Sequence, residues 1–298
     1  MFSVVVPLFN KEDSVSSAIR SILSQTYSNY ELIIINDGST DSSRKRAASF
    51  SDPRIQIIDQ QNMGVSAARN RGIKAASNPY LAFMDGDDIW EPEYLQTQKE
   101  LIQDYPEAGM WGCGMGILRN NQKYSFYHGL PEGYRGLIKN YFTMKKKGML
   151  FRPSGTVIHK SIFSEVGLFD ERIFFGEDLD ILYRIIFRYH PAFYNKNVAY
   201  YRIDAENNVV KTVKPIQKRF FYFIDKYEKE RAESVEFRQY FDRLVLAFMY
   251  EHRLKNESSD VVDNILEEMD FTLQSSKWKL VYAFPGLYKF YRRYIKSR

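Results

Sequence analysis

Three carboxylates fall within four consecutive residues in the run Asp85-Gly86-Asp87-Asp88. Like charges this close repel one another, so something must offset the cost of placing them together. Mg²⁺ and Mn²⁺ are hard cations that take oxygen ligands and are often shared between carboxylates and the phosphates of a substrate. The run therefore indicates a Mg²⁺ or Mn²⁺ site, with ordinary turn formation by Asp and Gly as the alternative explanation.

A second acidic group, Glu177-Asp178 followed by Asp180, precedes the apolar positions Leu182 and Ile185 of an expected helix. Acids at a helix start commonly compensate the helix dipole and cap the free N–H groups. A carboxylate at this place could equally act as a general base that takes a proton from an attacking hydroxyl. Both interpretations remain open at the level of these residues.

Residues 62–70 (NMGVSAARN) place a glycine and small residues at the start of another expected helix and add the cationic fork of Arg69. A diphosphate would suit an arginine beside a helix N-terminus. The alternative is a surface arginine on an amphipathic helix, and this segment alone favours that alternative.

Strand and helix patterns alternate along the first hundred residues. Short apolar runs predict strands at 3–7, 32–35, 55–58 and 80–84, and apolar residues at helical spacing predict helices over 15–23 and 65–76. This alternation predicts an α/β fold with a largely parallel sheet and helices on both faces.

Polar residues follow three of these strands. Phe9-Asn10 follows the first strand, Asp37 follows the second, and the Asp85–Asp88 run follows the fourth. Parallel strands bring all three to one edge of the sheet, and ligands in such folds bind outside the carboxyl ends of the strands. Turn formation alone could explain any one of these groups. It explains poorly why three acidic or polar groups share one edge of the sheet.

The order of motifs resembles that of family 2 glycosyltransferases of the bacterial surface-polysaccharide type. The matching segments are VVVPLFN, SILSQTY, YELIIINDGSTD, NMGVSAARN, AFMDGDD, VGLFDE and FFGEDLDILYRI, and they cover roughly residues 1–204. The resemblance implies a GT-A fold, which is a Rossmann-like sheet flanked by helices, and an inverting enzyme that uses a nucleotide sugar.

The resemblance also implies roles for individual residues. Asp178 would be the catalytic base, with Glu177 supporting it. Asp37 would accept a hydrogen bond from the ring nitrogen of uracil, and Asp87 would bind the metal ion, with Asp85 near the ribose, the phosphates and the metal. The further residues implied to hold or flank the nucleotide are Pro7, Phe9, Asn10, Asn62 and Arg69.

One motif departs from the family pattern. Many relatives carry a histidine near the metal or diphosphate, in a Tyr-Arg-x-His pattern, where this chain reads Tyr201-Arg202-Ile203-Asp204. Asp204 is then expected either to replace that histidine as a metal ligand or to leave the diphosphate to other groups.

Composition limits the class of protein. A single cysteine among 298 residues excludes a disulfide framework and a cysteine-built metal site, and it fits a reducing compartment. We find neither a signal peptide nor an apolar run long enough to span a membrane, so a cytoplasmic protein is expected. Fifteen of the sixteen glycines lie at or before Gly176, which predicts a catalytic domain over 1–210 and a helical region over 211–298.

The C-terminal tail, residues 277–298, has seven Lys or Arg residues, seven aromatic residues and no acid. The net charge of +5 therefore resides in this tail, because the first 276 residues carry −2. Bases among aromatics suit an anionic membrane surface, here the inner face of the cell membrane. The alternative is a helix packed on protein. A nucleic-acid partner is not expected, since the body lacks a basic face.

Together these features predict a metal-dependent inverting glycosyltransferase that moves a sugar, from a UDP-sugar in the favoured version, to a saccharide or a polyprenyl-linked oligosaccharide. One alternative is a sugar-1-phosphate nucleotidyltransferase, which would want a glycine-rich basic loop where residues 7–11 read PLFNK. Another is a binding module without catalysis, which would be expected to have lost acids such as Asp87 and Asp178.

Overall fold

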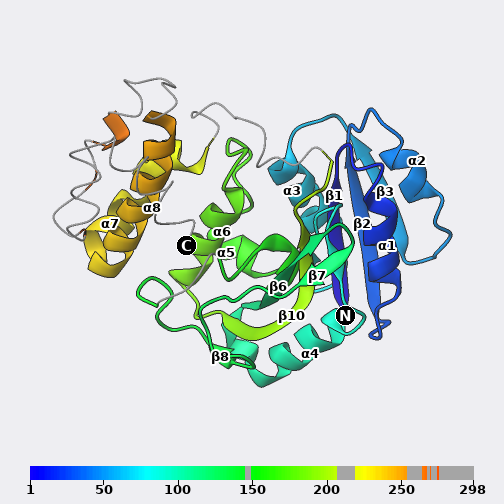
Figure 1. Ribbon diagram of the computed structural model, residues 1–298, viewed down its shortest axis with the longest axis horizontal. Helices are drawn as coiled ribbons and strands as arrows, with labels where there is room; N and C mark the ends of the chain where they lie inside the picture. The colour runs from blue at the N-terminus through cyan, green and yellow to red at the C-terminus, as the bar shows by residue number, and fades with distance from the viewer. Residues whose placement is uncertain (145–148, 207–218, 254–263, 267–268, 270–273, 275–298) are drawn as a thin grey trace. The chain divides into compact units, whose positions relative to one another are not determined.

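The computed structural model describes residues 1–144, 149–206, 219–253, 264–266, 269 and 274 (Figure 1). The chain divides into two compact units, one of residues 1–141 with 145–220 and one of residues 142–144 with 221–298. The expected boundary at 210/211 falls in 207–218, and the tail 277–298 also lies outside the described residues.

The first unit is built on one mixed sheet. Its central strands lie in the order β3-β2-β1-β4-β9-β6-β10-β5, with β7 paired to β6 and β8 paired to β10. The strands of the described chain are β1 (Phe2–Leu8), β2 (Tyr30–Asp37), β3 (Ile55–Gln60), β4 (Tyr80–Phe83), β5 (Ile89–Trp90), β6 (Met110–Arg119), β7 (Gln122–Tyr124), β8 (Arg135–Leu137), β9 (Thr156–His159) and β10 (Ala192–Arg202).

Most of the long strands run in one direction. β1 pairs in parallel with both β2 and β4, β2 pairs in parallel with β3, and β6 pairs in parallel with β10. β9 is antiparallel to both β4 and β6 and joins these two parallel groups. The four strands predicted from the sequence are therefore present and parallel.

Helices cover both faces of this sheet (Figure 1). On one face, Val4 and Val6 of β1 belong to a core that includes Ile19 and Leu101 from two helices. On the other face, Val5 of β1 lies so close to Gly72 that a Cβ there would come within 2.2 Å of its methyl carbon, so that helix lies directly on the sheet. The helices are α1 (Val15–Leu23), α2 (Ser43–Ala48), α3 (Val65–Ala75), α4 (Tyr94–Asp104), α5 (Ile162–Val166) and α6 (Glu177–Ile186), with 3₁₀ turns η1 (Pro106–Ala108) and η2 (Pro153–Gly155).

The described part of the second unit is mostly helical. It contains most of the 3₁₀ segment η5 (Phe220–Tyr227), then α7 (Glu228–Glu233) and α8 (Val235–Arg253). Phe237, Phe241 and Val245 of α8 are completely buried and form an apolar stripe at helical spacing. No helix in the described part of the chain is long and apolar enough to cross a membrane.

Candidate active site

The polar residues predicted to share a sheet edge do so. β1 lies between β2 and β4 and runs parallel to both, so the loops that begin at Phe9, Asp37 and Asp85 leave the sheet at the same edge. The acidic loop passes closely over the end of β1, because a Cβ on Gly86 would lie 3.3 Å from the carbonyl oxygen of Pro7. Glycine permits this approach.

Asp37 is buried at the end of β2 and is only 3% exposed. Its Oδ1 accepts hydrogen bonds from Gln60 Nε2 (2.7 Å) and from the N–H of Met63 (2.9 Å), and its Oδ2 accepts one from the N–H of Gly64 (2.9 Å). These three donors fix the carboxylate and leave Oδ2 with capacity for a further donor. A ring N–H of a nucleobase is such a donor.

Apolar side chains are exposed on both sides of Asp37. Phe9 follows β1 and is 40% exposed, and Met63 follows β3 and is 55% exposed. Asn10, by contrast, has its amide engaged in the fold, since its Oδ1 accepts from the N–H of Thr40 (2.8 Å). Asn62 is exposed and lies against Gly38. The pair Phe9 and Met63 is therefore the better candidate for contact with a flat ring.

Asp87 forms an ion pair with Lys11, a residue outside the motifs that imply the site. Lys11 Nζ lies 2.6 Å from Asp87 Oδ2 and 2.7 Å from the carbonyl oxygen of Glu206. The two charged side chains are only 13% and 12% exposed. Burial raises the pKa of Asp87, and the charge of Lys11 lowers it. The charge of Asp85 also raises this pKa, and the net shift is upward.

Asp88 is more deeply buried, and Arg202 fastens this part of the loop. The backbone N–H of Arg202 donates to Asp88 Oδ1 (3.1 Å), and its Nε donates to the carbonyl oxygen of Asp87 (3.1 Å). Burial, with the charges of Asp87 and Asp85, holds the pKa of Asp88 well above its usual range. Arg202 thus shapes the acidic loop from the end of β10.

Asp204 makes a different contact from the one expected. It is exposed and accepts a hydrogen bond from the N–H of Asn120 (2.7 Å). It faces an open cleft of about 310 Å³ whose other lining residues are Asp13, Ser14, Asn120, Asn121, Arg202, Ala205 and Glu206. The role of Asp204 as a metal ligand stays a prediction.

The donor chemistry of the acidic loop fits a divalent cation, although the ligand set is incomplete. Within the described ranges, no three His, Cys, Asp or Glu side chains are grouped closely enough to hold a metal ion. Asp85 and Asp87 nevertheless offer hard oxygen donors in a crowded acidic loop, and Asp87 already holds the cationic Lys11. A metal ion would take its remaining ligands from water and from the phosphates of a substrate.

Arg69 joins the acidic loop to the second acidic group. Its Nη2 lies 2.8 Å from Asp85 Oδ1, and its Nη1 lies 2.7 Å from Glu177 Oε1. The guanidinium is 2% exposed and stands 5.4 Å from the ring centre of Phe169. The motif resemblance implies a place for this arginine beside the nucleotide, whereas in the structure both of its terminal nitrogens hold carboxylates.

Glu177 and Asp178 form the first turn of α6, as predicted. The helix begins after Gly176, whose φ of +86° and close contact with Phe220 exclude a side chain there. Burial, and then the charge of Glu177, raise the pKa of Asp178 to about 7, while Arg69 acts in the opposite direction. A carboxylate with a pKa near neutrality is well matched to general-base catalysis.

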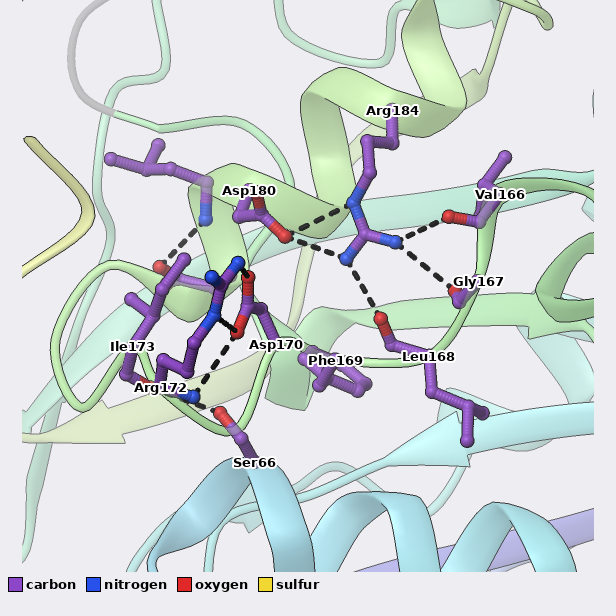
Figure 2. A network of polar contacts seen from close by, with 12 residues as sticks. Ser66, Val166, Gly167, Leu168, Phe169, Asp170, Arg172, Ile173, Asp180 and Arg184 are labelled. Atoms are coloured by element: carbon purple, nitrogen blue, oxygen red, sulfur yellow. Dashed lines mark hydrogen bonds and ion pairs between the residues drawn. The ribbon is translucent and has the colours of Figure 1, made fainter. Parts of the chain in front are cut away.

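A network of polar contacts anchors α6 to the segment before it (Figure 2). Asp180 is completely buried, and its Oδ2 accepts from Arg184 Nε (3.0 Å) and Nη2 (2.6 Å). The same guanidinium donates to the carbonyl oxygens of Val166, Gly167 and Leu168, which close the end of α5. Asp180 is therefore structural, whereas Asp178 lies within range of the charges of Arg69 and Asp85.

The fold is an α/β fold with parallel strands, and in such folds ligands bind at the carboxyl ends of those strands, where the acidic residues of this chain lie. Residues 3–167, more than half of the chain, match the family model described as Glycosyl transferase family 2. The chain therefore belongs to glycosyltransferase family 2, as the motif order implied.

Curated relatives agree with this assignment. WfgD of Escherichia coli, named a UDP-Glc:alpha-D-GlcNAc-diphosphoundecaprenol beta-1,3-glucosyltransferase, is 36% identical over 141 residues, which are 47% of this chain and 56% of WfgD. EpsJ of Bacillus subtilis, an uncharacterized glycosyltransferase, is 33% identical over 186 residues, or 60% of this chain and 54% of EpsJ. The glycosyltransferase GlyA of Streptococcus pneumoniae is 43% identical over 105 residues, 35% of this chain and only 15% of GlyA. The similarity thus spans about half the length of WfgD and EpsJ and a much smaller part of GlyA.

Solved structures confirm the GT-A fold. TarS of S. aureus in complex with UDP-GlcNAc superposes with a TM-score of 0.62 at 18% identity, covering 79% of this chain and 66% of the TarS chain. Another structure, of TarS residues 1–349, gives a TM-score of 0.57 at 15% identity and covers 89% and 90% of the two chains.

Proposed function

We propose that this protein is an inverting glycosyltransferase that moves a sugar from a UDP-sugar to a hydroxyl of a saccharide or lipid-linked saccharide in surface polysaccharide synthesis. The observation that carries the proposal is the convergence of Asp37, the acidic loop and the Glu177–Asp178 pair, the last two being joined through Arg69. The UDP-GlcNAc bound in the TarS complex and the lipid-linked acceptor in the name of WfgD support the choice of substrates.

The uracil ring would lie between Phe9 and Met63. Asp37, held by three internal donors, accepts the ring N–H, so the base is recognised by an acceptor that cannot rotate away. The diphosphate then extends along the sheet edge toward Asp85 and Asp87. A divalent cation, when bound to these two carboxylates, would neutralise the charge of the diphosphate as it leaves.

Asp178 carries the proton transfer. Its carboxylate takes the proton of the acceptor hydroxyl, while the hydroxyl oxygen forms a bond to the anomeric carbon from the face opposite the diphosphate. The bond between the anomeric carbon and the diphosphate oxygen breaks, and UDP leaves with that electron pair. A single displacement inverts the configuration, so an α-linked donor gives a β-linked product.

The test is calorimetric titration with UDP in the presence of Mn²⁺ and again with EDTA, followed by a panel of UDP-sugars. We expect UDP binding that requires the metal, with GDP and dTDP binding more weakly. Absence of UDP binding under both conditions contradicts the proposed donor. Equal binding with EDTA contradicts the proposed metal site while leaving the donor in place. The anomeric configuration of the product, read from its proton coupling by NMR, tests inversion separately.

A further inference from the structure

We infer that Arg69 is a positioning residue that sets the distance between Asp85 on the donor side and the Glu177–Asp178 pair, and that it does not bind the diphosphate. The inference rests on the proposed function in taking Asp178 as the base and Asp85 as part of the donor site. The geometry that supports it consists of two ion pairs from one buried guanidinium, at 2.8 Å and 2.7 Å.

The planar guanidinium fork determines this geometry. Nη1 and Nη2 each hold a different carboxylate, so the rigid plane fixes the separation of Asp85 from Glu177. Arg69 Nε is buried and has no hydrogen-bond partner among the described residues. With the group 2% exposed and its terminal nitrogens occupied, a phosphate could reach it only by displacing one of the carboxylates.

Three side chains on one face of helix α3 contact residues 169–177, the segment that leads into α6 and includes its first residue. Ser66 Oγ donates to the carbonyl oxygen of Ile173 (3.1 Å), as Figure 2 shows, and Asn70 Nδ2 donates to that of Phe169 (2.9 Å). Arg69 lies between them at helical spacing and reaches Glu177. Ser66 and Asn70 therefore fix the backbone of the segment that leads into α6. Of these three side chains, Arg69 is the one that also contacts the acidic loop, through Asp85.

Charge explains why an arginine is needed between these groups. Glu177 and Asp178 are adjacent acids, and the charge of Glu177 acts on Asp178. With Asp85 nearby, three carboxylates would repel one another if the cation were removed. Loss of Arg69 should therefore let the first turn of α6 move away from the acidic loop. Lysine carries the charge but lacks the fork, so it should not restore the spacing.

The kinetic test compares Arg69→Lys and Arg69→Met with Arg71→Ala, an exposed position on the same helix. We expect kcat with a UDP-sugar to fall by about 100-fold in both Arg69 variants, the loss that a misplaced catalytic group produces. The calorimetric affinity for uridine should match the wild type, and the affinity for UDP should be the same in the lysine and methionine variants, because neither has the guanidinium fork. A selective loss of UDP affinity with uridine affinity intact, partly restored by lysine, would show a phosphate ligand and overturn the inference.

Hydrogen–deuterium exchange gives a readout that does not depend on activity. In Arg69→Met, peptides covering 84–88 and 174–182 should exchange faster than in the wild type, while peptides from β2 and β3 of the same variant should exchange at the wild-type rate. In Arg71→Ala, all of these peptides should exchange at the wild-type rate. Unchanged exchange in both peptides would overturn the inference. This readout does not require sugar transfer, so it tests the inference even if the proposed function is wrong. If Arg69→Met does not fold, Arg69→Lys serves for the same measurement.

Discussion

Lys11 and Asp87 are paired at 2.6 Å between the end of β1 and the acidic loop, in surroundings that leave both side chains nearly buried. The ammonium of Lys11 is thus bound at the carboxylate that we propose as a metal ligand. Lys11 also donates to the backbone carbonyl oxygen of Glu206. The side-chain carboxylate of Glu206 accepts a hydrogen bond from the N–H of Ser14 (3.0 Å) at the start of α1. A cation arriving at Asp87 must compete with this arrangement.

Replacing Lys11 with methionine should strengthen metal binding. Lys11→Met removes the competing charge and keeps most of the side-chain volume, so we expect Mn²⁺ to bind at least about tenfold more tightly, a change of about 1.4 kcal/mol. The measurement is the Mn²⁺ affinity without nucleotide, by electron paramagnetic resonance. Lys74→Met, at an exposed position, is the control. Weaker or unchanged Mn²⁺ binding in Lys11→Met would count against Asp87 as a ligand.

Asp37→Asn should alter base selectivity. In the proposed complex the carboxylate accepts a ring N–H from uracil, whereas cytosine presents an acceptor at that position, so the wild type should bind UDP more tightly than CDP. We expect UDP affinity to fall by about 10- to 100-fold, as for loss of a hydrogen bond to a charged group, and the gap between UDP and CDP to narrow. Calorimetry with both nucleotides provides the check, with the exposed Asp59→Asn as a charge-matched control. Retention of the full preference for UDP would remove Asp37 from base recognition.

Much of this site follows from the sequence, because it depends on local pattern and on a rule of topology. Alternating apolar runs predict the strands, and parallel pairing then places Asp37 and Asp85 at one edge. Lys11 and Asp87 are 76 positions apart, and their pairing depends on the course of two loops, which no local pattern specifies. The same holds for Arg69, since a helix pattern predicts the face on which it lies but not which of several acids it reaches. Two cationic residues in the sequence could have pointed to these contacts. Lys11 lies in the loop after the first strand, and Arg202 lies at the end of the last strand.

The raised pKa of Asp178 predicts how stability depends on pH. In the folded protein this pKa is about 7, above the ordinary 3.8, so the folded state binds more protons than the unfolded state between those values. Stability contributed by the protonated group is therefore lost as the pH rises through this window. We expect Asp178→Asn to melt at a higher temperature than the wild type at about pH 8, with a smaller difference at about pH 5. Calorimetric melting curves provide the measurement, and a difference that does not vary with pH would contradict this pKa.

The basic, aromatic tail predicts binding to anionic membranes. Replacing Arg292, Arg293 and Lys296 with glutamine should weaken binding to phosphatidylglycerol vesicles by about 3 kcal/mol, at about 1 kcal/mol for each base. Binding should also weaken as salt rises, and vesicles of phosphatidylcholine serve as the uncharged control. Sedimentation with vesicles measures both. If the full chain does not sediment with anionic vesicles, or the variant sediments equally well, the tail instead packs on protein.

The most direct test of the account is the turnover and UDP-sugar affinity of Asp178→Asn, measured side by side with the wild type. Asparagine keeps the shape of the side chain but cannot take the proton of the acceptor hydroxyl. We predict that kcat falls by about 10²- to 10⁴-fold, while the calorimetric affinity for the UDP-sugar with Mn²⁺ stays that of the wild type. Turnover close to the wild-type rate would show that Asp178 is not the base and would contradict the central claim.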